Sequence, residues 1–195
     1  DKTPNEALYI DVAFRQGVPV ALNGEEMSPV NLVQHLNDLA GRHGIGRIDH
    51  IENRLVGIKS REVYEAPAGI VLHNSHKALE TMTLSKEQLR MKQRIAQEYA
   101  DVVYNGLWYT AHRQDLDAYV ESTQRHVTGT VRVKFQKGSC TVVGRQAPRA
   151  LYSHQLATYD RGDTFDHRAS EGFISIYGLP VRTQAQQQSE DRHDS

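Results

Sequence analysis

The chain has 195 residues, and its 23 Lys and Arg nearly balance its 24 Asp and Glu, which leaves a formal net charge of −1. A charge so close to zero gives no electrostatic reason to expect nucleic acid or a membrane surface as a partner. No apolar run approaches the roughly 18 residues that cross a bilayer. Cys140 is the single cysteine, which excludes an internal disulfide and suits a reducing, cytoplasmic location.

The start of the sequence bears on whether the chain is complete. Its first seven residues are polar and predict no secretory signal peptide. It begins with Asp1 rather than methionine and reaches a strand-like pattern almost at once. We therefore expect the chain to be a fragment of a longer protein.

Two strand-like stretches come first. In residues 10–14, Ile, Val and Phe alternate with Asp and Ala, and in residues 18–22 Val, Val and Leu alternate back. Gln16-Gly17 connects the two stretches, and Asn23-Gly24 follows as a second turn sequence. The pattern predicts a β-hairpin.

A helix is expected next. Ser28-Pro29 is typical of a helix start, because serine caps free N–H groups and proline is tolerated at the first helical position. Apolar residues then recur at three and seven positions after Val33, and Gly44 suits a helix end. These signals predict a helix over residues 29–43, followed by a stretch without a clean period over residues 45–66.

Three more helices are predicted in the middle of the chain. Pro67 opens one that runs to about residue 81. Ser85 and Gln88 form a capping-box pattern before a long amphipathic helix, and Thr110 suits the cap of a third.

The last part combines a hairpin, one ambiguous element and a polar tail. Residues 131–142 alternate on both sides of the turn Lys137-Gly138, which predicts a second hairpin. Asp166 suits the cap of a final helix, but the residues after it also alternate, so helix and strand both stay open. From Thr183 onward the chain is almost entirely polar, which is typical of disorder.

This order of elements predicts an α+β fold, in which antiparallel β-hairpins form a sheet that packs with amphipathic helices. We expect one domain over residues 1–182 and a disordered tail over residues 183–195.

Three features could carry chemistry but have more ordinary interpretations. The G-x-G formed by Gly44 and Gly46 fits a helix end and a turn better than a phosphate loop. His73 and His76 lie three residues apart, without partners at zinc-site spacing. Cys140 falls on an apolar strand face and is interpreted as a core residue. We therefore assign no catalytic residue and no metal ligand.

The densest polar stretch, residues 47–65, mixes charges of both signs with short apolar runs. Such a stretch suits a site for a zwitterionic ligand, and it also suits a surface covered by salt bridges. From these residues alone the surface interpretation is favoured.

In this stretch the sequence resembles the argininosuccinate synthase family. Ordered matches over roughly residues 8–180 carry the resemblance, and together they are far more specific than any single motif. The matching segments are Gly44-Ile45-Gly46-Arg47-Ile48-Asp49, Glu52-Asn53-Arg54, Gly57-Ile58-Lys59-Ser60-Arg61, Val63-Tyr64-Glu65-Ala66-Pro67, residues 99–108, Val127-Thr128-Gly129, Val142-Val143-Gly144-Arg145, Leu151-Tyr152-Ser153 and Glu171-Gly172-Phe173-Ile174.

The resemblance implies a carbon–nitrogen ligase of arginine biosynthesis. Members of the family join citrulline and aspartate into argininosuccinate at the cost of ATP, with Mg as the accompanying ion and with AMP and pyrophosphate as products. A nucleotide-binding domain precedes the synthetase domain, and a C-terminal helix joins subunits into a homotetramer. The resemblance places this chain in the C-terminal synthetase and oligomerisation part, so ATP and Mg would be bound mainly outside it.

Two citrulline-binding positions of the family are carried over. The Glu of E-N-R corresponds to Glu52, and the Tyr of Y-E-x-P corresponds to Tyr64, with the family spacing of twelve residues intact. Glu62 and Ala66 depart from the Gly and Thr that many members have. Pro180 falls where many members continue a helix, which puts the length of the oligomerisation arm in doubt.

Other interpretations follow from the same residues. Glu52 could instead pair with Arg54 or Arg47, with Tyr64 in the core. The chain could be a non-catalytic amino-acid-binding or assembly module. Because no phosphate loop occurs in the sequence, we expect these 195 residues alone to make no argininosuccinate.

Overall fold

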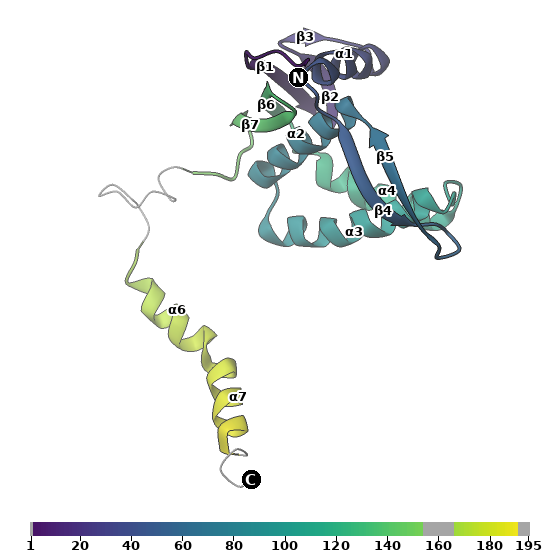
Figure 1. Cartoon of the computed structure of the whole chain (residues 1–195). Coiled ribbons are helices and arrows are strands. Elements are labelled where there is room, and N and C mark those ends of the chain that lie inside the picture. Colours follow the sequence, from purple (N-terminus) through teal and green to yellow (C-terminus); the bar gives the residue numbers. More distant parts are fainter. Residues whose placement is uncertain (1, 154–165, 191–195) are drawn as a thin grey trace. The chain divides into compact units, whose positions relative to one another are not determined.

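A computed structural model describes residues 2–153 and 166–190. The chain divides into two compact units, Asp1–Tyr152 and Ser153–Ser195, and each is described by itself. We predicted a domain boundary at residue 182, whereas this division falls after residue 152 (Figure 1).

A five-stranded antiparallel sheet organises the first unit, with the strand order β3-β2-β1-β6-β7. Both predicted hairpins are confirmed, and pairing of β1 with β6 joins them although they lie far apart in the sequence. The result confirms the predicted α+β class. The strands are β1 (Leu8–Arg15), β2 (Val18–Leu22), β3 (Glu25–Glu26), β6 (Gly129–Gln136) and β7 (Ser139–Gln146).

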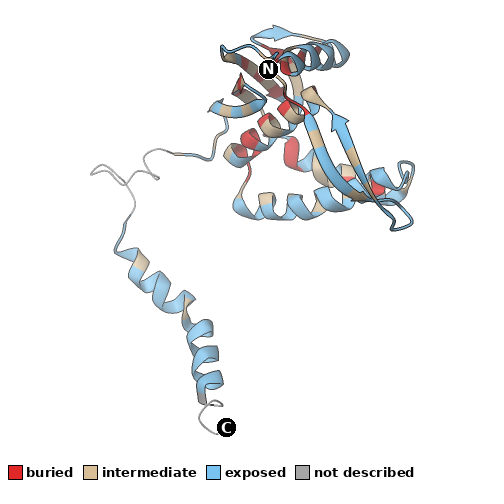
Figure 2. Cartoon of the chain, in the orientation of Figure 1, coloured by how far each residue is buried: buried red, intermediate tan, exposed pale blue. Residues whose placement is uncertain are grey.

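The core lies between one face of this sheet and two helices. Alternating residues of β1 and β6 point to that face, and Val12, Val133 and Phe135 are fully buried there. Helices α1 (Pro29–Arg42) and α2 (Pro67–Thr83) supply the opposing apolar side chains (Figure 2).

Helix α1 forms as predicted at both ends. Ser28 Oγ accepts a hydrogen bond from the Asn31 N–H at 3.4 Å, and Gly44 follows the last turn with a φ of +74°. The buried row is Leu32, Leu36 and Ala40. The predicted positions Leu36 and Ala40 are therefore confirmed, whereas Val33, which we took as the start of the apolar repeat, is 39% exposed and Leu32 takes its place.

Two further helices, α3 (Lys86–Tyr104) and α4 (Ala111–Gln124), follow α2. Ser85 and Gln88 form the predicted capping box, and Thr110 caps α4 as predicted. The Tyr99 hydroxyl donates a 2.6 Å hydrogen bond to Asp117 and so ties α3 to α4.

The stretch without a clean period forms a second antiparallel sheet of two strands, β4 (Arg47–Asn53) and β5 (Lys59–Glu65). This β4–β5 hairpin was not predicted. None of its residues is buried. Its strands therefore lack the alternation of apolar and polar residues by which a strand with one buried face is recognised in a sequence.

The described part of the second unit is helical. It consists of α6 (Ala169–Tyr177) and α7 (Leu179–Glu190), so the ambiguous segment after Asp166 is a helix rather than a strand. Residues 183–190 continue in α7, where we predicted a disordered tail, and residues 191–195 lie outside the described residues. Pro180 is accommodated in the first turn of α7, where a missing N–H costs no helical bond.

Among the described residues, no helix has the length and apolar character that crossing a bilayer requires.

Candidate functional site

The base of the β4–β5 hairpin is held closely against the start of α2. Gly46 has a φ of +114°, and a Cβ there would lie 2.5 Å from the backbone nitrogen of Pro67. The Ala66 N–H donates a 2.9 Å hydrogen bond to the Gly46 carbonyl. Only glycine fits this close approach, so the base of the hairpin has little freedom to pivot.

The register of the hairpin decides which side chains meet. Glu52 lies opposite Ser60, and Ile48 lies opposite Tyr64. Side chains alternate between the two faces of a strand, so every second residue from Ile48 to Glu52 shares a face with Ser60 and Tyr64. The two residues selected by resemblance, Glu52 and Tyr64, therefore lie on the same face.

The side chains of Glu52 and Tyr64 are in contact. The Tyr64 hydroxyl donates to the two carboxylate oxygens of Glu52 at 3.3 and 3.4 Å. His50, two residues before Glu52 on the same strand, places Nε2 3.4 Å from Glu52 Oε2, and its ring lies 5.4 Å from the Tyr64 ring. These distances are longer than those of strong O–H···O bonds, so the carboxylate can still accept stronger donors.

The Tyr64 hydroxyl stays protonated. Partial burial, together with the negative charges of Glu52 and Glu62, raises the pKa of Tyr64 above its ordinary value. The phenol can therefore donate to a carboxylate while its oxygen lone pairs accept from a ligand.

Three cationic side chains near the tip of the hairpin, those of Arg54, Lys59 and Arg61, are paired with groups other than Glu52. Arg61 donates two hydrogen bonds to Asp49 on the opposite face, at 2.9 and 2.6 Å, and this interaction lowers the pKa of Asp49. Arg54 lies 3.6 Å from Glu62. Among the described residues, no Arg or Lys forms an ion pair with Glu52. Tyr64 is 45% exposed and so is not a core residue.

Sequence reasoning gave His50 no role of its own. The spacing of two residues between His50 and Glu52 could have indicated that His50 belongs to the site, because it puts both side chains on one face of a strand. The hairpin had to be recognised before that spacing could be used.

The other predicted candidates lie elsewhere. His73 and His76 line a cavity of about 390 Å³ between α2 and α3, where His76 bonds to Gln124 at 2.8 Å. Across the described ranges, no group of three or more His, Cys, Asp or Glu residues is arranged to hold a metal ion. Cys140 is half-buried beside the core, and burial raises the pKa of its thiol, which suits a packing residue.

Residues 1–184 match the sequence model of a family described as "Arginosuccinate synthase C-terminal domain". The chain belongs to this family. A protein of Dehalococcoides mccartyi named argininosuccinate synthase is 59% identical over 188 residues, which are 96% of this chain and 46% of that protein.

Other relatives with the same name give the same coverage. The protein of Symbiobacterium thermophilum is 56% identical over 182 residues, covering 93% of this chain and 45% of the relative. That of Acaryochloris marina is 54% identical over 186 residues, covering 95% and 47%. The chain thus spans about half the length of the curated relatives it matches.

The residues of this argininosuccinate synthase C-terminal domain do not fit a nucleotide and its metal. The one G-x-G is used for a helix end at Gly44 and for close packing at Gly46.

Proposed function

We propose that this chain supplies citrulline-binding groups and a subunit interface to an argininosuccinate synthase, which joins citrulline and aspartate with release of AMP and pyrophosphate from ATP. The observation that carries the first part of the proposal is the contact between Glu52 and Tyr64 on one face of the β4–β5 hairpin. Two family positions twelve residues apart meet there, and neither is committed to an ion pair with Arg or Lys among the described residues.

Citrulline carries an ammonium, a carboxylate and a neutral ureido group. The Glu52 carboxylate would accept a charge-assisted hydrogen bond from the ammonium, and such bonds are roughly twice as strong as neutral ones. Tyr64 would keep the carboxylate in place by donating to it and would accept from the same ammonium. Held in this way, the amino acid would direct its ureido oxygen to the α-phosphorus, so this chain would contribute orientation to the reaction.

The test uses a chimaera, in which the part of the Dehalococcoides mccartyi relative outside the match is joined to this chain. In it, Glu52→Gln should raise the citrulline KM about 10- to 100-fold, because a hydrogen bond to a charged group contributes about 1.5–3 kcal/mol. Tyr64→Phe should raise it less, by about 2- to 10-fold, since a neutral donor is lost. Steady-state kinetics with each substrate varied in turn measure both effects, and the KM for ATP should stay within about twofold of the parent.

Asp49→Asn is the matched control, because Asp49 is a carboxylate of the same strand that lies on the opposite face. It should leave citrulline kinetics unchanged. If Asp49→Asn and Glu52→Gln have equal effects, or if Glu52→Gln has none, the site assignment is wrong. A chimaera that binds citrulline but never forms argininosuccinate would favour a non-catalytic binding module instead.

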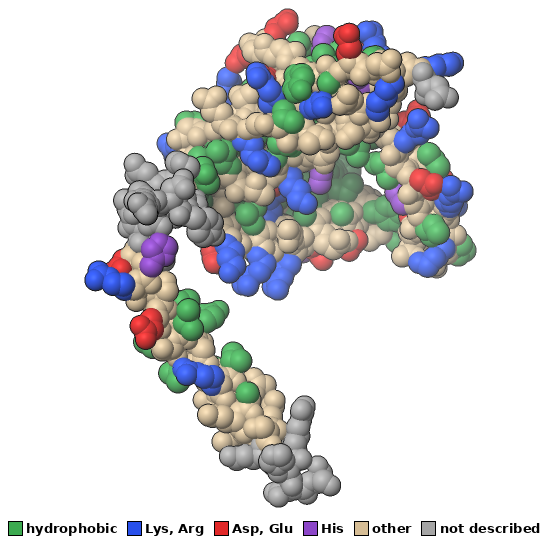
Figure 3. Space-filling view, turned by 60° about the vertical axis from the view of Figure 1, so that its left-hand side comes forward, with side chains coloured by type: hydrophobic (Ala, Val, Ile, Leu, Met, Phe, Trp, Pro, Cys, Tyr) green, Lys and Arg blue, Asp and Glu red, His purple; other side chains and the backbone are tan. Residues whose placement is uncertain are grey.

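The second part of the proposal is that α6 helps to form a homotetramer. Four large apolar side chains of this helix are more than 60% exposed within the chain, and Figure 3 shows hydrophobic side chains along this segment. They are Phe173, Ile174, Ile176 and Tyr177. Apolar surface of this kind on a helix is typical of an interface with another copy.

Light scattering at micromolar concentration measures this association. The chain should form dimers or tetramers, and Phe173→Glu combined with Ile176→Glu should shift it to monomers. Gln186→Glu, on the exposed surface of α7, adds a charge without removing apolar area and should leave the mass unchanged. A clean monomer of the parent chain would contradict an interface carried by α6.

A further inference from the structure

A pocket lined by basic side chains lies at the end of the five-stranded sheet, on residues that do not belong to the β4–β5 hairpin. Its volume is about 470 Å³, and it opens where the β1–β2 turn, the end of α4 and the chain after β7 come together. Four of its lining side chains are basic or imidazole groups. They are Arg15, Arg125, His126 and Arg149, and the remaining lining residues are Gln16, Thr128 and Pro148.

The hydrogen bonds among the residues that line this arginine pocket leave N–H and O–H donors without a partner. Arg149 Nη1 lies 2.9 Å from His126 Nδ1. A guanidinium can only donate, so His126 Nδ1 accepts and the ring proton sits on Nε2 as a further donor. Thr128 Oγ1 accepts a 2.9 Å bond from the Gln16 N–H, which leaves the Thr128 hydroxyl proton free to donate.

The charge in the arginine pocket is positive, although the whole chain carries −1. Arg15 is paired with Glu26 at 2.7 Å. The Arg125 side chain has no hydrogen bond or ion pair with any residue of the described part, and the Arg149 side chain is bonded there only to His126. The C-terminal end of α4 adds about half a negative charge, which two unneutralised guanidinium groups outweigh.

The frame around the arginine pocket is fixed. The Gly17 N–H donates to the Val127 carbonyl at 2.8 Å, next to the bond from Gln16 to Thr128. A Cβ at Gly17 would lie 2.4 Å from Gln124 Oε1, so the β1–β2 turn sits directly on the end of α4. The backbone segments that carry these donors are therefore held near one another before any ligand arrives, which lowers part of the entropic cost of binding.

We propose that the arginine pocket binds a small oxyanion with at least two negative charges, such as inorganic phosphate or pyrophosphate. Bidentate donation by planar guanidinium groups is the usual way in which proteins hold phosphoryl oxygens, and Arg125 and Arg149 are free to provide it. The arginine pocket shares no residue with the Glu52–Tyr64 pair, so the oxyanion proposal and the citrulline proposal can fail independently.

Thermal unfolding of this chain tests the proposal, with phosphate or pyrophosphate added against sodium chloride of equal ionic strength. At ten times the Kd, the melting temperature should rise by about 3–6 °C. Arg125→Gln combined with Arg149→Gln should abolish the rise. Arg61→Gln combined with Arg132→Gln removes the same charge outside the pocket, from arginines paired with Asp49 and Asp11, and should keep it.

Amide chemical shifts of the unaltered chain give a second reading that needs no variant. During a phosphate titration they should move at Gln16, Gly17 and residues 125–128, and stay in place along the hairpin. The proposal would be overturned if chloride raised the melting temperature as much as phosphate, or if both double variants lost the rise equally. It would also be overturned if amide shifts changed over all basic surfaces. Each result would mean that the anion is bound by general charge alone.

Discussion

The two antiparallel sheets of this chain are built in opposite ways. The five-stranded sheet buries one face of its central strands, with Val12, Val131 and Phe135 at 0% exposure. The β4–β5 hairpin buries no residue at all, and Ile51 on its outer face is 67% exposed. The large sheet is therefore held by its core, whereas the hairpin is held by its own ladder, cross-strand polar pairs and the anchor at Gly46.

The large sheet therefore contributes mainly to stability, whereas the hairpin offers side chains to a ligand. Core side chains are surrounded by neighbours and cannot be offered to a ligand. The hairpin has the reverse property, because its side chains have few competing partners. Glu52 and Tyr64 belong to this second kind of surface, which suits residues that must exchange weak internal contacts for a ligand.

The largest contrast should come from truncating one apolar side chain in each sheet. Phe135→Ala should lower the free energy of unfolding by about 3–5 kcal/mol, because it leaves a cavity in a closed core. Ile51→Ala should change it by no more than about 0.5 kcal/mol, since the side chain is mostly in water. Urea unfolding followed by circular dichroism measures both. A comparable cost for Ile51→Ala would show that the outer face of the hairpin is covered in solution.

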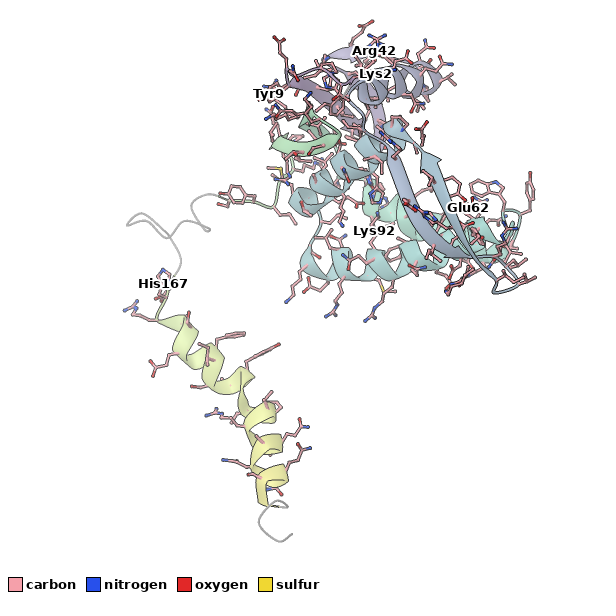
Figure 4. All side chains as sticks on the ribbon, viewed as in Figure 1. Lys2, Tyr9, Arg42, Glu62, Lys92 and His167 are labelled. Carbon is pink, nitrogen blue, oxygen red and sulfur yellow. The ribbon has the colours of Figure 1, made fainter. Side chains whose placement is uncertain are left out.

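A second contrast concerns lysines. Lys92 of α3, labelled in Figure 4, lies 2.8 Å from the buried carboxylate of Glu80, whereas Lys59 of the hairpin donates a 2.6 Å bond to Asn53 at the surface. Lys92→Ala should cost about 2–3 kcal/mol of stability, because Glu80 keeps only Gln124 and His76 as partners. Lys59→Ala should cost less than about 0.5 kcal/mol.

The same urea experiment compares these two variants. Lys92→Met is an additional control, because it keeps most of the apolar stem and removes only the charge. If Lys92→Met is as stable as the parent, the ion pair with Glu80 contributes nothing and the contrast with Lys59 disappears.

The smallest contrast concerns two matched Arg–Asp pairs and their dependence on pH. Arg132 hydrogen-bonds to Asp11 on the large sheet, and Arg61 to Asp49 on the hairpin, and each interaction lowers the pKa of the aspartate below its ordinary 3.8. A carboxyl group of this kind stabilises the fold above pH 3.8, and the stabilisation is lost as the pH falls through the lowered folded pKa.

Arg132→Gln should therefore lower the urea midpoint at pH 7 and leave it unchanged at the acid end of the range. Arg61→Gln should have a smaller effect at pH 7, because the Asp49 side chain is 52% exposed and that of Asp11 only 28%. Midpoints measured in steps from pH 7 downward give both curves. An equal drop for the two variants would mean that the hairpin pair is as well shielded from water as the sheet pair.

Sequence periodicity predicted the elements that pack on the core, because burial of one face is what creates a period. Residues 10–14 and 131–135 alternate for this reason, and the Ser85 capping box marked α3 correctly. The β4–β5 hairpin has no buried face, so the alternation that would reveal it is absent. Helix α7 was missed for a related reason, since its glutamines favour a helix locally while offering nothing to bury.

The candidate site could be found only by resemblance. Charges of both signs in residues 47–65 favoured a surface of salt bridges, and the structure does contain the Arg61–Asp49 and Arg54–Glu62 pairs. What composition could not reveal is that Glu52 is left out of them. That result depends on strand register, which places Glu52 beside Tyr64 and His50.

The register of the hairpin also has an evolutionary consequence. Glu52 and Tyr64 meet because β4 and β5 pair as they do, and the turn at residues 54–58 only connects them. Residues inserted at that tip would lengthen the interval between the two side chains along the chain while leaving their distance in space unchanged. A single residue inserted within either strand would turn one of them to the opposite face. The contact between Glu52 and Tyr64 therefore depends on the number of residues in each strand and not on the length of the turn.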